Sequence, residues 1–326
     1  MFNIFISCFY FQSNSNTVKT DNIKVVDSIE KDKYLDIITS DNIKERIIID
    51  NKGLKEEDKS IKKKKEKNVE NILLVGIDAR ADNFKYARAD TIIVASINKS
   101  KKQIGLTSLM RDTYVKIPGH RNNRINASYA FGGIELLKKT INKNFNLNID
   151  KHIIINFKGF EKVINILDGV YVDIKKYEIK ELNRCLIGLR RSTRNFISQS
   201  GLNHLNGQQA LAYCRIRRVG NGDYERTERQ RGVLKSIIEK VKELKFSQYP
   251  KIIASIYPYV KTNLSSIEWL KLIYNYYGIK NWNVESMQIP TDKSGRPRKI
   301  NSMWVIDPDI EECIKYIQEF IYSDCN

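Results

Sequence analysis

The first sustained apolar run is NILLVG, residues 71–76, which ends at a glycine and is typical of a buried strand. Two further β-rich runs follow at 91–97 and 103–109. The connection between them is short and polar, which predicts a β-hairpin. Apolar residues then recur at helical spacing over 134–145 and predict a helix. The ordered part of the chain is therefore expected to begin with three strands and a helix.

The middle of the chain alternates short strands and helices. Strands are predicted at 153–157 and 170–174, with a short helix between them that Gly169 closes. Residues 175–200 are basic and weakly patterned, which predicts a loop or a mobile flap. Residues 205–217 predict a short helix that runs into an extended segment.

The last third predicts one long helix and several shorter elements. Asp223 stands where it would cap a helix that starts directly after it. Six apolar residues then follow at helical period and predict a core-facing stripe: Val233, Leu234, Ile237, Ile238, Val241 and Leu244. Ser265 and Glu268 predict a capping box. An edge strand is expected at 284–290 and a final helix at 307–321, with no internal repeat and no second domain boundary.

The first 69 residues lack such periodicity. MFNIFISCFYF, residues 1–11, is apolar but shorter than the roughly 20 residues that span a membrane. No basic residue precedes it, so it does not match a signal peptide. Two interpretations stay open: the end of a truncated membrane anchor, or a short, poorly ordered N-terminus. Residues 51–70 are charged and of low complexity, which predicts that 1–69 ends in a disordered Lys-rich tether and that the ordered domain covers 70–326.

Charge narrows the class of partner. The chain has 326 residues and a formal net charge of +18 at pH 7, part of which lies in the tether. Such a charge favours a polyanion: nucleic acid, an anionic membrane surface or a phosphorylated substrate. The 5 cysteines form no CxxC motif and lack zinc-site spacing with the 3 histidines, which argues against structural zinc. Their odd number argues against a disulfide framework.

The stretch from Tyr213 to Arg231 is unusually rich in arginine. It contains no lysine, although lysine is the common base elsewhere, and its basic residues are Arg215, Arg217, Arg218, Arg226, Arg229 and Arg231. Planar guanidinium groups bind phosphate and carboxylate in a bidentate manner. The stretch therefore predicts an anion site, against the simpler interpretation as a solvated basic helix start. Arg218 and Arg231 are expected to be ordinary surface charge.

Two parts of this stretch are expected to converge. Arg226, Arg229 and Gln230 lie three and four residues apart at the start of the predicted helix, where backbone N–H groups also favour an anion. Arg215 and Arg217 are two residues apart on the predicted extended segment, so they are expected to point the same way into one pocket.

Carboxylates are expected on the same rim of the sheet. Asp78 follows the first strand in GIDAR, and Asp90 opens the second strand in ARADT. Paired carboxylates beside a phosphate are a common way to hold Mg²⁺. Arg111 and Asp112 follow the third strand, which on its own indicates no more than a surface ion pair. RINASYAFGG, residues 124–133, has a Gly-Gly pair that is expected to open a helix. The sequence contains no P-loop, GxGxxG, GxSxG or HExxH motif.

Six motifs occur in a fixed order along the chain: GIDAR, RADT, SLMRDTYVKIPG, RINASYAFGG, NGQQALAYCRIR and DYERTERQR. This series resembles the LytR-CpsA-Psr family of cell-wall assembly proteins over about residues 70–245, and VKTNLSSIEWLKL extends the resemblance towards the C-terminus. The resemblance implies a mixed α/β sandwich, with a central sheet flanked by helices and an apolar tunnel for a lipid. Met110 in place of a usual proline, a single Gly169 where Gly-Gly is common, and the absent or truncated N-terminal membrane helix depart from the family pattern.

The resemblance also implies a function. Family members act outside the cytoplasmic membrane and move glycopolymers, such as teichoic acid or related polysaccharides, from a polyprenyl-pyrophosphate carrier to peptidoglycan. Residues 70–326 would then be the catalytic domain of a glycopolymer–peptidoglycan phosphotransferase, with Asp78 and Asp90 as ligands of Mg²⁺, or of Mn²⁺ in its place. The pyrophosphate would be bound by a set of basic and polar residues: Arg88, Arg111, Arg215, Arg217, Arg226 and Gln230.

The catalytic residues implied beside the pyrophosphate are Arg111, Asp112 and Asp223. An attacking sugar hydroxyl needs a carboxylate to accept its proton, and Asp90, Asp112 and Asp223 all stay open for that role. One alternative function is a non-catalytic envelope protein that binds anionic lipid or polymer with the same arginines. A transcription attenuator that binds nucleic acid is disfavoured, because no helix-turn-helix, zinc finger or RNA-recognition aromatic motif occurs.

Overall fold

The computed structural model describes residues 68–78, 87–189, 195–265, 267–269, 271 and 281–322. The apolar N-terminus and the Lys-rich tether lie outside these ranges apart from their last residues, so the division into 1–69 and 70–326 stays a prediction. Within the described ranges, no helix is long and apolar enough to cross a membrane.

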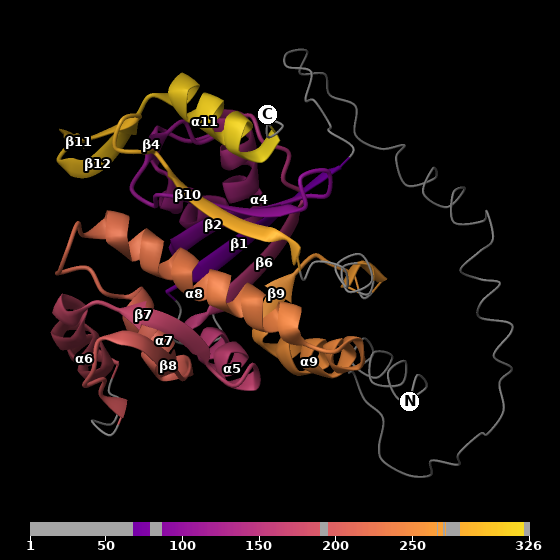
Figure 1. Ribbon diagram of the computed structural model, residues 1–326. Coiled ribbons are helices and arrows are strands. Elements are labelled where there is room, and N and C mark those ends of the chain that lie inside the picture. The colour runs from indigo at the N-terminus through magenta and orange to yellow at the C-terminus, as the bar shows by residue number, and fades with distance from the viewer. Residues whose placement is uncertain are drawn as a thin grey trace, which may run out of the picture. The chain divides into compact units, whose positions relative to one another are not determined.

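Six strands of the described chain form one central sheet of mixed strand direction (Figure 1). Across the sheet they are β10 (Asn283–Ile289), β3 (Gln103–Leu109), β2 (Ala89–Asn98), β1 (Val69–Ile77), β6 (Lys151–Asn156) and β9 (Val260–Thr262). The three strands β1, β2 and β3 pair antiparallel, whereas β10 joins β3 and β6 joins β1 in parallel. The predicted hairpin between β2 and β3 and the predicted edge strand β10 are both confirmed.

Three two-stranded ladders lie outside the central sheet among the described residues. They are β4 (Tyr114–Val115) with β5 (Asn123–Arg124), β7 (Val170–Ile174) with β8 (Gly201–Leu205), and β11 (Gly295–Ile300) with β12 (Met303–Pro308).

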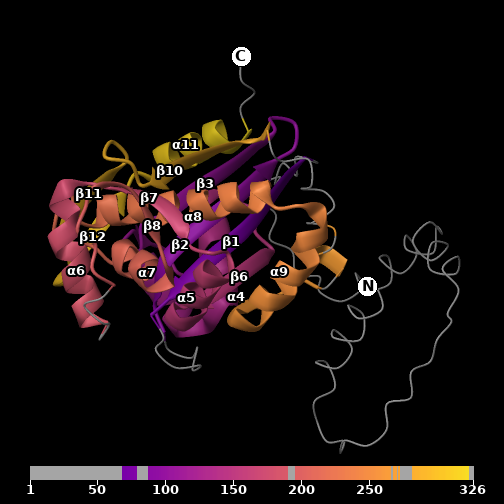
Figure 2. The same cartoon turned by 60° about the horizontal axis from the view of Figure 1, so that its bottom comes forward.

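The helices surround the sheet (Figure 2). They are α4 (Ile125–Phe145), α5 (Phe157–Ile166), α6 (Ile179–Gly188), α7 (Gly207–Cys214), α8 (Asp223–Glu243), α9 (Tyr249–Ile256) and α11 (Ile310–Tyr322), with 3₁₀ turns η1 (Lys176–Glu178), η3 (Phe246–Gln248) and η4 (Tyr257–Tyr259).

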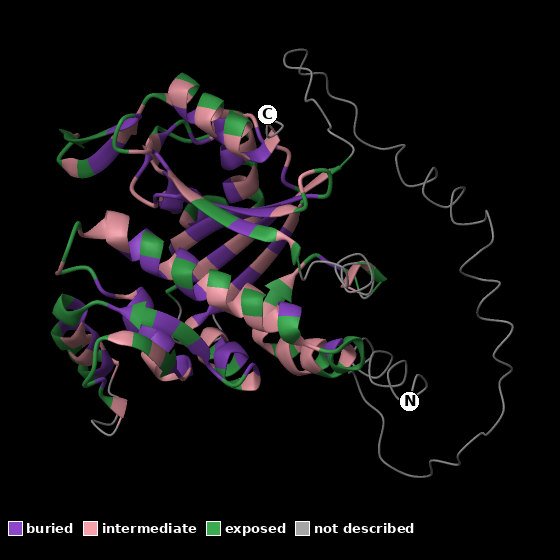
Figure 3. Ribbon diagram, in the orientation of Figure 1, coloured by how far each residue is buried: buried purple, intermediate pink, exposed green. Residues whose placement is uncertain are grey.

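Helices cover both faces of the central sheet. On one face, α4 and α11 pack against Leu73, Val75 and Val94. On the other, α8 packs through Leu234 and Ile238 against Ile93 and its neighbours. Strands buried on both faces read as continuous apolar runs rather than as an alternation, which is why β1 to β3 were identifiable from sequence. Figure 3 shows these strands as largely buried, and the predicted mixed sheet flanked by helices is confirmed.

A second, smaller core lies below α8. It is formed by β7, β8, α6 and α7 and includes Val172, Leu182 and Leu205. Val233 of α8 belongs to this core, whereas Leu234 packs on the sheet, so the predicted apolar stripe of α8 divides between two cores. The helix is thereby fixed on both sides, which matters because its first turns carry charged side chains of the candidate site.

Two local predictions are wrong. The loop or flap predicted at 175–200 is wrong for 176–188, because η1 and α6 occupy these residues. Residues 190–194 lie outside the described ranges, and 196–200 belong to no helix or strand. Leu182 and Leu186, one helical turn apart, are fully buried and stabilise α6 against the smaller core. The Gly132–Gly133 pair does not open α4 either: the helix begins at Ile125, and the pair kinks it, with Gly133 at a φ of 64°.

Candidate functional site

One cavity of about 870 Å³ lies between the central sheet and helices α5, α7 and α8. Part of its lining is apolar: Leu74, Ile93, Ile153, Ile155, Phe160, Val163, Leu211, Leu234, Ile237, Ile256 and Val260. Another part is charged or polar and includes Asp78, Arg88, Asp90, Arg111, Asp112, Arg124, Asn126, Arg184, Arg215, Arg217, Arg226 and Gln230. The apolar part corresponds to the tunnel that the sequence predicts, and the cavity suits a ligand with an apolar body and an anionic group.

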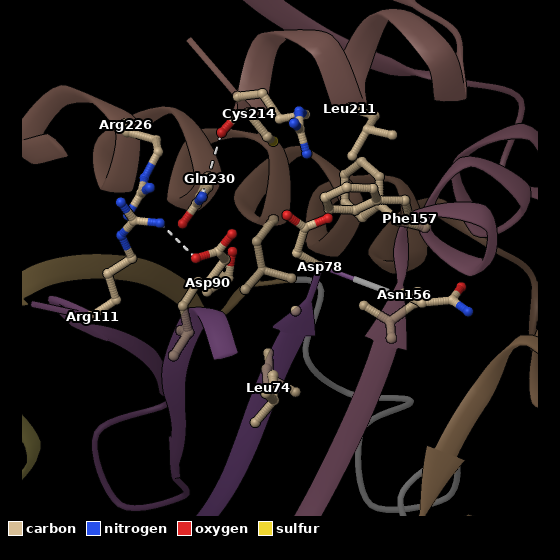
Figure 4. A pocket seen from close by; sticks show the side chains of 18 of the residues that line it. Leu74, Asp78, Asp90, Arg111, Asn156, Phe157, Leu211, Cys214, Arg226 and Gln230 are labelled. Atoms are coloured by element: carbon tan, nitrogen blue, oxygen red, sulfur yellow. Dashed lines mark hydrogen bonds and ion pairs between the residues drawn. The ribbon is translucent and has the colours of Figure 1, made fainter. Parts of the chain in front are cut away.

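The charged part lies where β1 and β3 end and where β2 and α8 begin. Figure 4 shows Asp90 at the start of β2 and Arg111 just after β3, with Arg226 and Gln230 reaching in from α8. The guanidinium groups of Arg111 and Arg226 point toward one another (Figure 4). Residues distant in sequence therefore meet because the strand ends of one sheet share an edge.

Asp223 stands at the centre of an ion-pair network, which we call the Asp223 cluster: Asp90, Arg111, Arg217, Asp223 and Arg226. Its carboxylate lies 3.3 Å from Arg226 Nη1, 3.6 Å from Arg111 Nη2 and 3.7 Å from Arg217 Nε. Asp90 accepts a hydrogen bond of 2.6 Å from Arg111 Nη1 and lies 3.9 Å from Arg217 Nη2. Arg111 also lies 3.4 Å from Asp112, which in turn lies 3.3 Å from Arg124. With these two neighbours included, four arginines face three carboxylates, which leaves a surplus positive charge.

Arg226 shows this surplus most clearly. Only 2% of its side chain is exposed, yet Nε and Nη1 have no hydrogen-bond partner, since the contact with Asp223 is an ion pair without hydrogen-bond geometry. Burial, followed by the charge of Arg111, lowers the pKa of Arg226 to about 10. A buried guanidinium with free donors is a position that an anionic ligand would stabilise.

The pKa values of Arg217 and Arg111 also depend on burial and on the charges around them. Burial and the nearby Arg111 lower the pKa of Arg217. Burial alone would lower the pKa of Arg111, but Asp90, Asp112 and Asp223 outweigh it and raise that pKa.

The two remaining carboxyl groups shift in opposite directions. Burial raises the pKa of Asp112, even though Arg111 and Arg124 oppose that effect. For Asp223, burial is outweighed by Arg226, Arg111 and Arg217, and the pKa falls below the ordinary value. Of the two, Asp112 is therefore the carboxyl group whose pKa lies above the ordinary value.

Arg215 and Arg217 both line the cavity, but not on an extended segment. Arg215 is the C-cap of α7, with its backbone N–H donating to the carbonyl of Ala212, so the helical turn continues through it. Its guanidinium stacks 4.6 Å from the centre of the Phe157 ring. Arg217 follows with 42% of its side chain exposed, at the solvent-facing rim of the cavity.

Asp78 and Arg88 lie on the same rim, joined by a hydrogen bond of 3.4 Å from the Asp78 N–H to the Arg88 carbonyl. Asp78 and Asp90 thus face one cavity as predicted, and oxygen donors of this kind suit a hard divalent cation. In the described part of the chain, no group of three or more acidic, histidine or cysteine residues is arranged to hold a metal. Phosphate oxygens and water would therefore have to complete the coordination, a set that fits Mg²⁺.

A second network, one turn further along α8, holds the arginine-bearing segment in place. We call Glu178, Glu225 and Arg229 the Arg229 cluster. Arg229 is 3% exposed, and its Nε and Nη2 donate to Glu178 (2.7 Å) and Glu225 (2.5 Å). Its Nη1 donates to the carbonyl of Ile216 at 3.2 Å.

The next residue of α8 makes a similar contact. Gln230 donates from Nε2 to the carbonyl of Cys214 at 3.4 Å. Arg229 and Gln230 together therefore fix the backbone on both sides of Arg215. Arg229 does not line the cavity with Arg226 and Gln230, although the three were predicted to share a face.

Three further sequence predictions need correction or comment. Asp223 does not cap α8: the N-cap is Gly222 without a side-chain hydrogen bond, because the Asp223 carboxylate is drawn to the arginines instead. Arg231 is not surface charge but only 8% exposed, and burial lowers its pKa to about 10. Arg218 is exposed, as predicted.

The sequence model of the LytR_cpsA_psr family matches residues 37–319. The chain belongs to this family. Its relatives include the polyisoprenyl-teichoic acid–peptidoglycan teichoic acid transferase TagU of Enterococcus faecalis, 37% identical over 209 residues that cover 63% of this chain and 65% of TagU. The polyisoprenyl-teichoic acid–peptidoglycan teichoic acid transferase TagT of Bacillus subtilis is 33% identical over 241 residues, 71% of this chain and 72% of TagT. The chain therefore spans just under two thirds of the length of TagU.

Solved structures of the LytR-CpsA-Psr family share this fold. TagT bound to LIIa-WTA has a TM-score of 0.65 and 28% identity, covering 82% of this chain and 95% of TagT. TagT with bound octaprenyl pyrophosphate lipid has a TM-score of 0.61 and the same identity and coverage. A further relative, regulatory protein MsrR of Staphylococcus aureus, is 32% identical over 228 residues, 68% of this chain and 65% of MsrR.

Sequence reasoning assigned no role to several residues of the cavity. Arg124 lies in the quoted family motif RINASYAFGG, and in the structure its Nη1 is 3.3 Å from Asp112. Phe157 ends the predicted strand 153–157 and instead begins α5, where its ring supports Arg215. The motif was the available signal for Arg124; nothing in the local sequence pointed to Phe157.

Proposed function

We propose that this family member transfers an anionic glycopolymer, teichoic acid or a related polysaccharide, from a polyprenyl-pyrophosphate carrier to peptidoglycan. The observation that carries the proposal is the union, in one cavity, of an arginine-rich end with unpaired donors and an apolar interior. A polyprenyl pyrophosphate has the same two parts. The names of TagU and TagT, and the octaprenyl pyrophosphate bound to TagT, support this substrate class.

The arginines would bind and orient the pyrophosphate. Arg226 and Arg111 face one another across the charged end, and Arg217 stands at the rim, so two phosphate groups would meet cations on several sides. Arginine suits this role because it forms bidentate hydrogen bonds with phosphate. The prenyl chain would occupy the apolar part of the cavity, between Leu74 of the sheet and Leu234 of α8.

The reaction would be a phosphoryl transfer to a sugar hydroxyl. The hydroxyl oxygen of the acceptor attacks the phosphorus next to the glycopolymer, and the bond from that phosphorus to the bridging oxygen breaks. The prenyl phosphate leaves with the electron pair, and the arginines stabilise the charge that develops on it. The hydroxyl proton passes to a carboxylate, for which Asp112 is favoured because burial raises its pKa.

Asp78 and Asp90 would hold Mg²⁺, or Mn²⁺, together with phosphate oxygens. When bound, the cation would neutralise charge on the phosphates. Asp90 Oδ1 is already held by Arg111 at 2.6 Å, so Asp90 is oriented before any ligand arrives. Asp78 makes no comparable ion pair among the described residues, which leaves its carboxylate available.

The substrates place the reaction at the outer face of the cell membrane. Both a polyprenyl carrier and peptidoglycan would be accessible there, and the positive net charge would favour an anionic membrane surface. The alternative function is non-catalytic: the protein would bind the same lipid at the cell envelope without turning it over.

A transfer assay separates the two functions. Purified protein is incubated with a polyprenyl-pyrophosphate-linked glycan and uncrosslinked peptidoglycan strands, with Mg²⁺ or with a chelator. The proposal expects prenyl phosphate release and glycan attachment, both reduced by the chelator. Tight lipid binding with no release under either condition would establish the non-catalytic binder instead.

A further inference from the structure

The hairpin β11–β12 exposes an indole ring beside the candidate site. Trp304 of β12 is 66% exposed, although the next two residues, Val305 and Ile306, are buried. The strand is thus anchored from within while the large side chain projects outward. Lys299 faces Trp304 across the ladder, so the two side chains share one side of the hairpin.

The hairpin is attached directly to the charged end of the cavity. The backbone N–H of Ile306 donates to the carbonyl of Asp112 at 2.9 Å. Arg124 donates from Nη2 to the carbonyl of Trp304 at 2.5 Å, while its Nη1 lies 3.3 Å from the Asp112 carboxylate. One arginine therefore links the exposed tryptophan to the carboxylate that is favoured as proton acceptor.

We propose that Trp304 and Lys299 form a docking surface for a sugar ring of the acceptor glycan. The proposal rests on the proposed transfer reaction. An indole face carries negative charge density and attracts the polarised C–H groups of a pyranose ring, and an exposed rigid aromatic side chain loses little entropy on binding. The ammonium of Lys299 can donate hydrogen bonds to sugar hydroxyl or carboxyl oxygens.

Position favours the acceptor over the membrane. Helix α8 has 21 residues and is about 30 Å long at roughly 1.5 Å per residue. Its first turn lies in the charged end of the cavity, whereas Ile256 and Val260, at the apolar end, belong to α9 and β9. Figures 1 and 2 both show β11–β12 near the start of α8 and α9 near its end. The hairpin thus lies away from the end that would receive the prenyl chain.

The position of Asp112 favours the acceptor over the donor glycopolymer. Charge does not separate the two, because exposed arginines occur in the cavity lining, at Arg184 and Arg217, and also on the hairpin, at Arg296 and Arg298. On the hairpin side stands Asp112, which the attacking hydroxyl must approach. A glycan strand with one hydroxyl at Asp112 would therefore place a neighbouring sugar over Trp304.

The test compares Trp304→Ala and Trp304→Phe in the transfer assay, with Phe246→Ala as the matched control. Phe246 is an exposed aromatic residue (46%) on η3, beyond the other end of α8. Trp304→Ala is expected to raise the KM for peptidoglycan strands about tenfold, with the KM for the lipid-linked donor unchanged. Trp304→Phe keeps a stacking face and should lie close to wild type, as should the control.

Three results would overturn the docking surface. They are an unchanged acceptor KM, a raised donor KM, or loss of binding to anionic phospholipid vesicles in Trp304→Ala. A fluorescence titration of Trp304 with N-acetylglucosamine oligosaccharides gives a second readout that needs no turnover. If wild type transferred no glycan, the proposed function would fail. A spectral change that is present in wild type and absent in Trp304→Phe would still support sugar docking, and its absence would refute it.

Discussion

Two clusters of buried charge lie one turn apart on α8 and differ in how their buried arginine is paired. In the Arg229 cluster, Arg229 has one partner for each nitrogen of its guanidinium group: Glu178, Glu225 and the carbonyl of Ile216. In the Asp223 cluster, Arg226 lies among other arginines and keeps two nitrogens without hydrogen bonds. Both arginines are almost fully buried, so burial alone does not distinguish scaffold from binding site.

This difference indicates which of the buried charged groups a bound ligand would stabilise. A buried arginine whose nitrogens all have partners stabilises the fold that presents the site. A buried arginine with unpaired nitrogens among other cations destabilises the ligand-free protein, and this cost is offset when an anion binds. The pKa of Arg226 is lowered to about 10, which means that the folded chain disfavours the charged form of this guanidinium group. The comparison predicts opposite consequences for substitutions at Arg226 and Arg229.

The largest effect is expected from Arg229→Met. The change leaves Glu178 buried without its cation and should lower the free energy of unfolding by about 3–5 kcal/mol. Urea denaturation followed by circular dichroism measures this loss. Lys235→Met, an exposed position on the same helix, serves as the control. A stability equal to wild type would show that the Arg229 cluster is not a scaffold.

Arg226→Met should act on activity rather than on stability. Removal of one cation that faces the pyrophosphate is expected to reduce the transfer rate by about 10²–10³-fold. The unfolding free energy should fall much less than in Arg229→Met, because Arg226 repels Arg111 and contributes unfavourable charge below pH 10. Steady-state transfer kinetics and denaturation curves on the same sample separate the two effects. A large loss of stability with normal turnover would reverse the assignment.

Inorganic pyrophosphate should stabilise the ligand-free protein through the same surplus. At a concentration one hundred times its Kd, the expected gain in unfolding free energy is about 2.7 kcal/mol. The gain should persist in Glu178→Gln, whose baseline stability is lower, and vanish in Arg226→Met. Differential scanning calorimetry measures the gain in unfolding free energy in both variants. An equal gain in Arg226→Met would place the anion elsewhere.

The smallest effect concerns pH. Burial raises the pKa of Asp112, so if this carboxylate accepts the proton, the acid limb of kcat should lie above the range of an ordinary aspartate. Activity is then lost as pH falls through that raised pKa, because the protonated carboxyl group no longer accepts a proton. Asp112→Asn should abolish the limb together with most of the rate. A limb at the ordinary pKa of aspartate that survives in Asp112→Asn would assign the base to Asp90 or Asp223.

Much of the fold was predictable because it depends on local patterns. The strands β1, β2 and β3 can be recognised from their apolar runs, and α11 from its apolar stripe, without any tertiary contact. Helix α6 was missed because Leu182 and Leu186 give a narrow apolar face within a run of charges. Strand β8, with the sequence GLNHL, was missed because its stability comes from pairing with β7, a contact between distant segments.

The candidate site was likewise predictable only in part. Residue types and motif order predicted the arginines and aspartates that line the cavity, although Asp223 does not line it but pairs with Arg111, Arg217 and Arg226. The partners of these residues follow from packing. Residue type and spacing do not distinguish Arg226 from Arg229, three residues apart, because the distinction depends on Glu178 of a distant turn. Only the family resemblance assigned Arg226, and not Arg229, to the pyrophosphate. The wrong assignment of Asp223 as a helix cap has the same origin, since a tertiary ion pair replaced the local hydrogen bond.

The central claim is that one cavity binds a pyrophosphate at its arginine-rich end and a prenyl chain in its apolar part. Calorimetric titration with geranylgeranyl pyrophosphate, geranylgeraniol and inorganic pyrophosphate, on wild type and Arg226→Met, tests it most directly. The account predicts that the prenyl pyrophosphate binds wild type more tightly than either fragment, and that Arg226→Met weakens it to the level of the alcohol. Equal affinity for the prenyl pyrophosphate in both proteins would contradict the account.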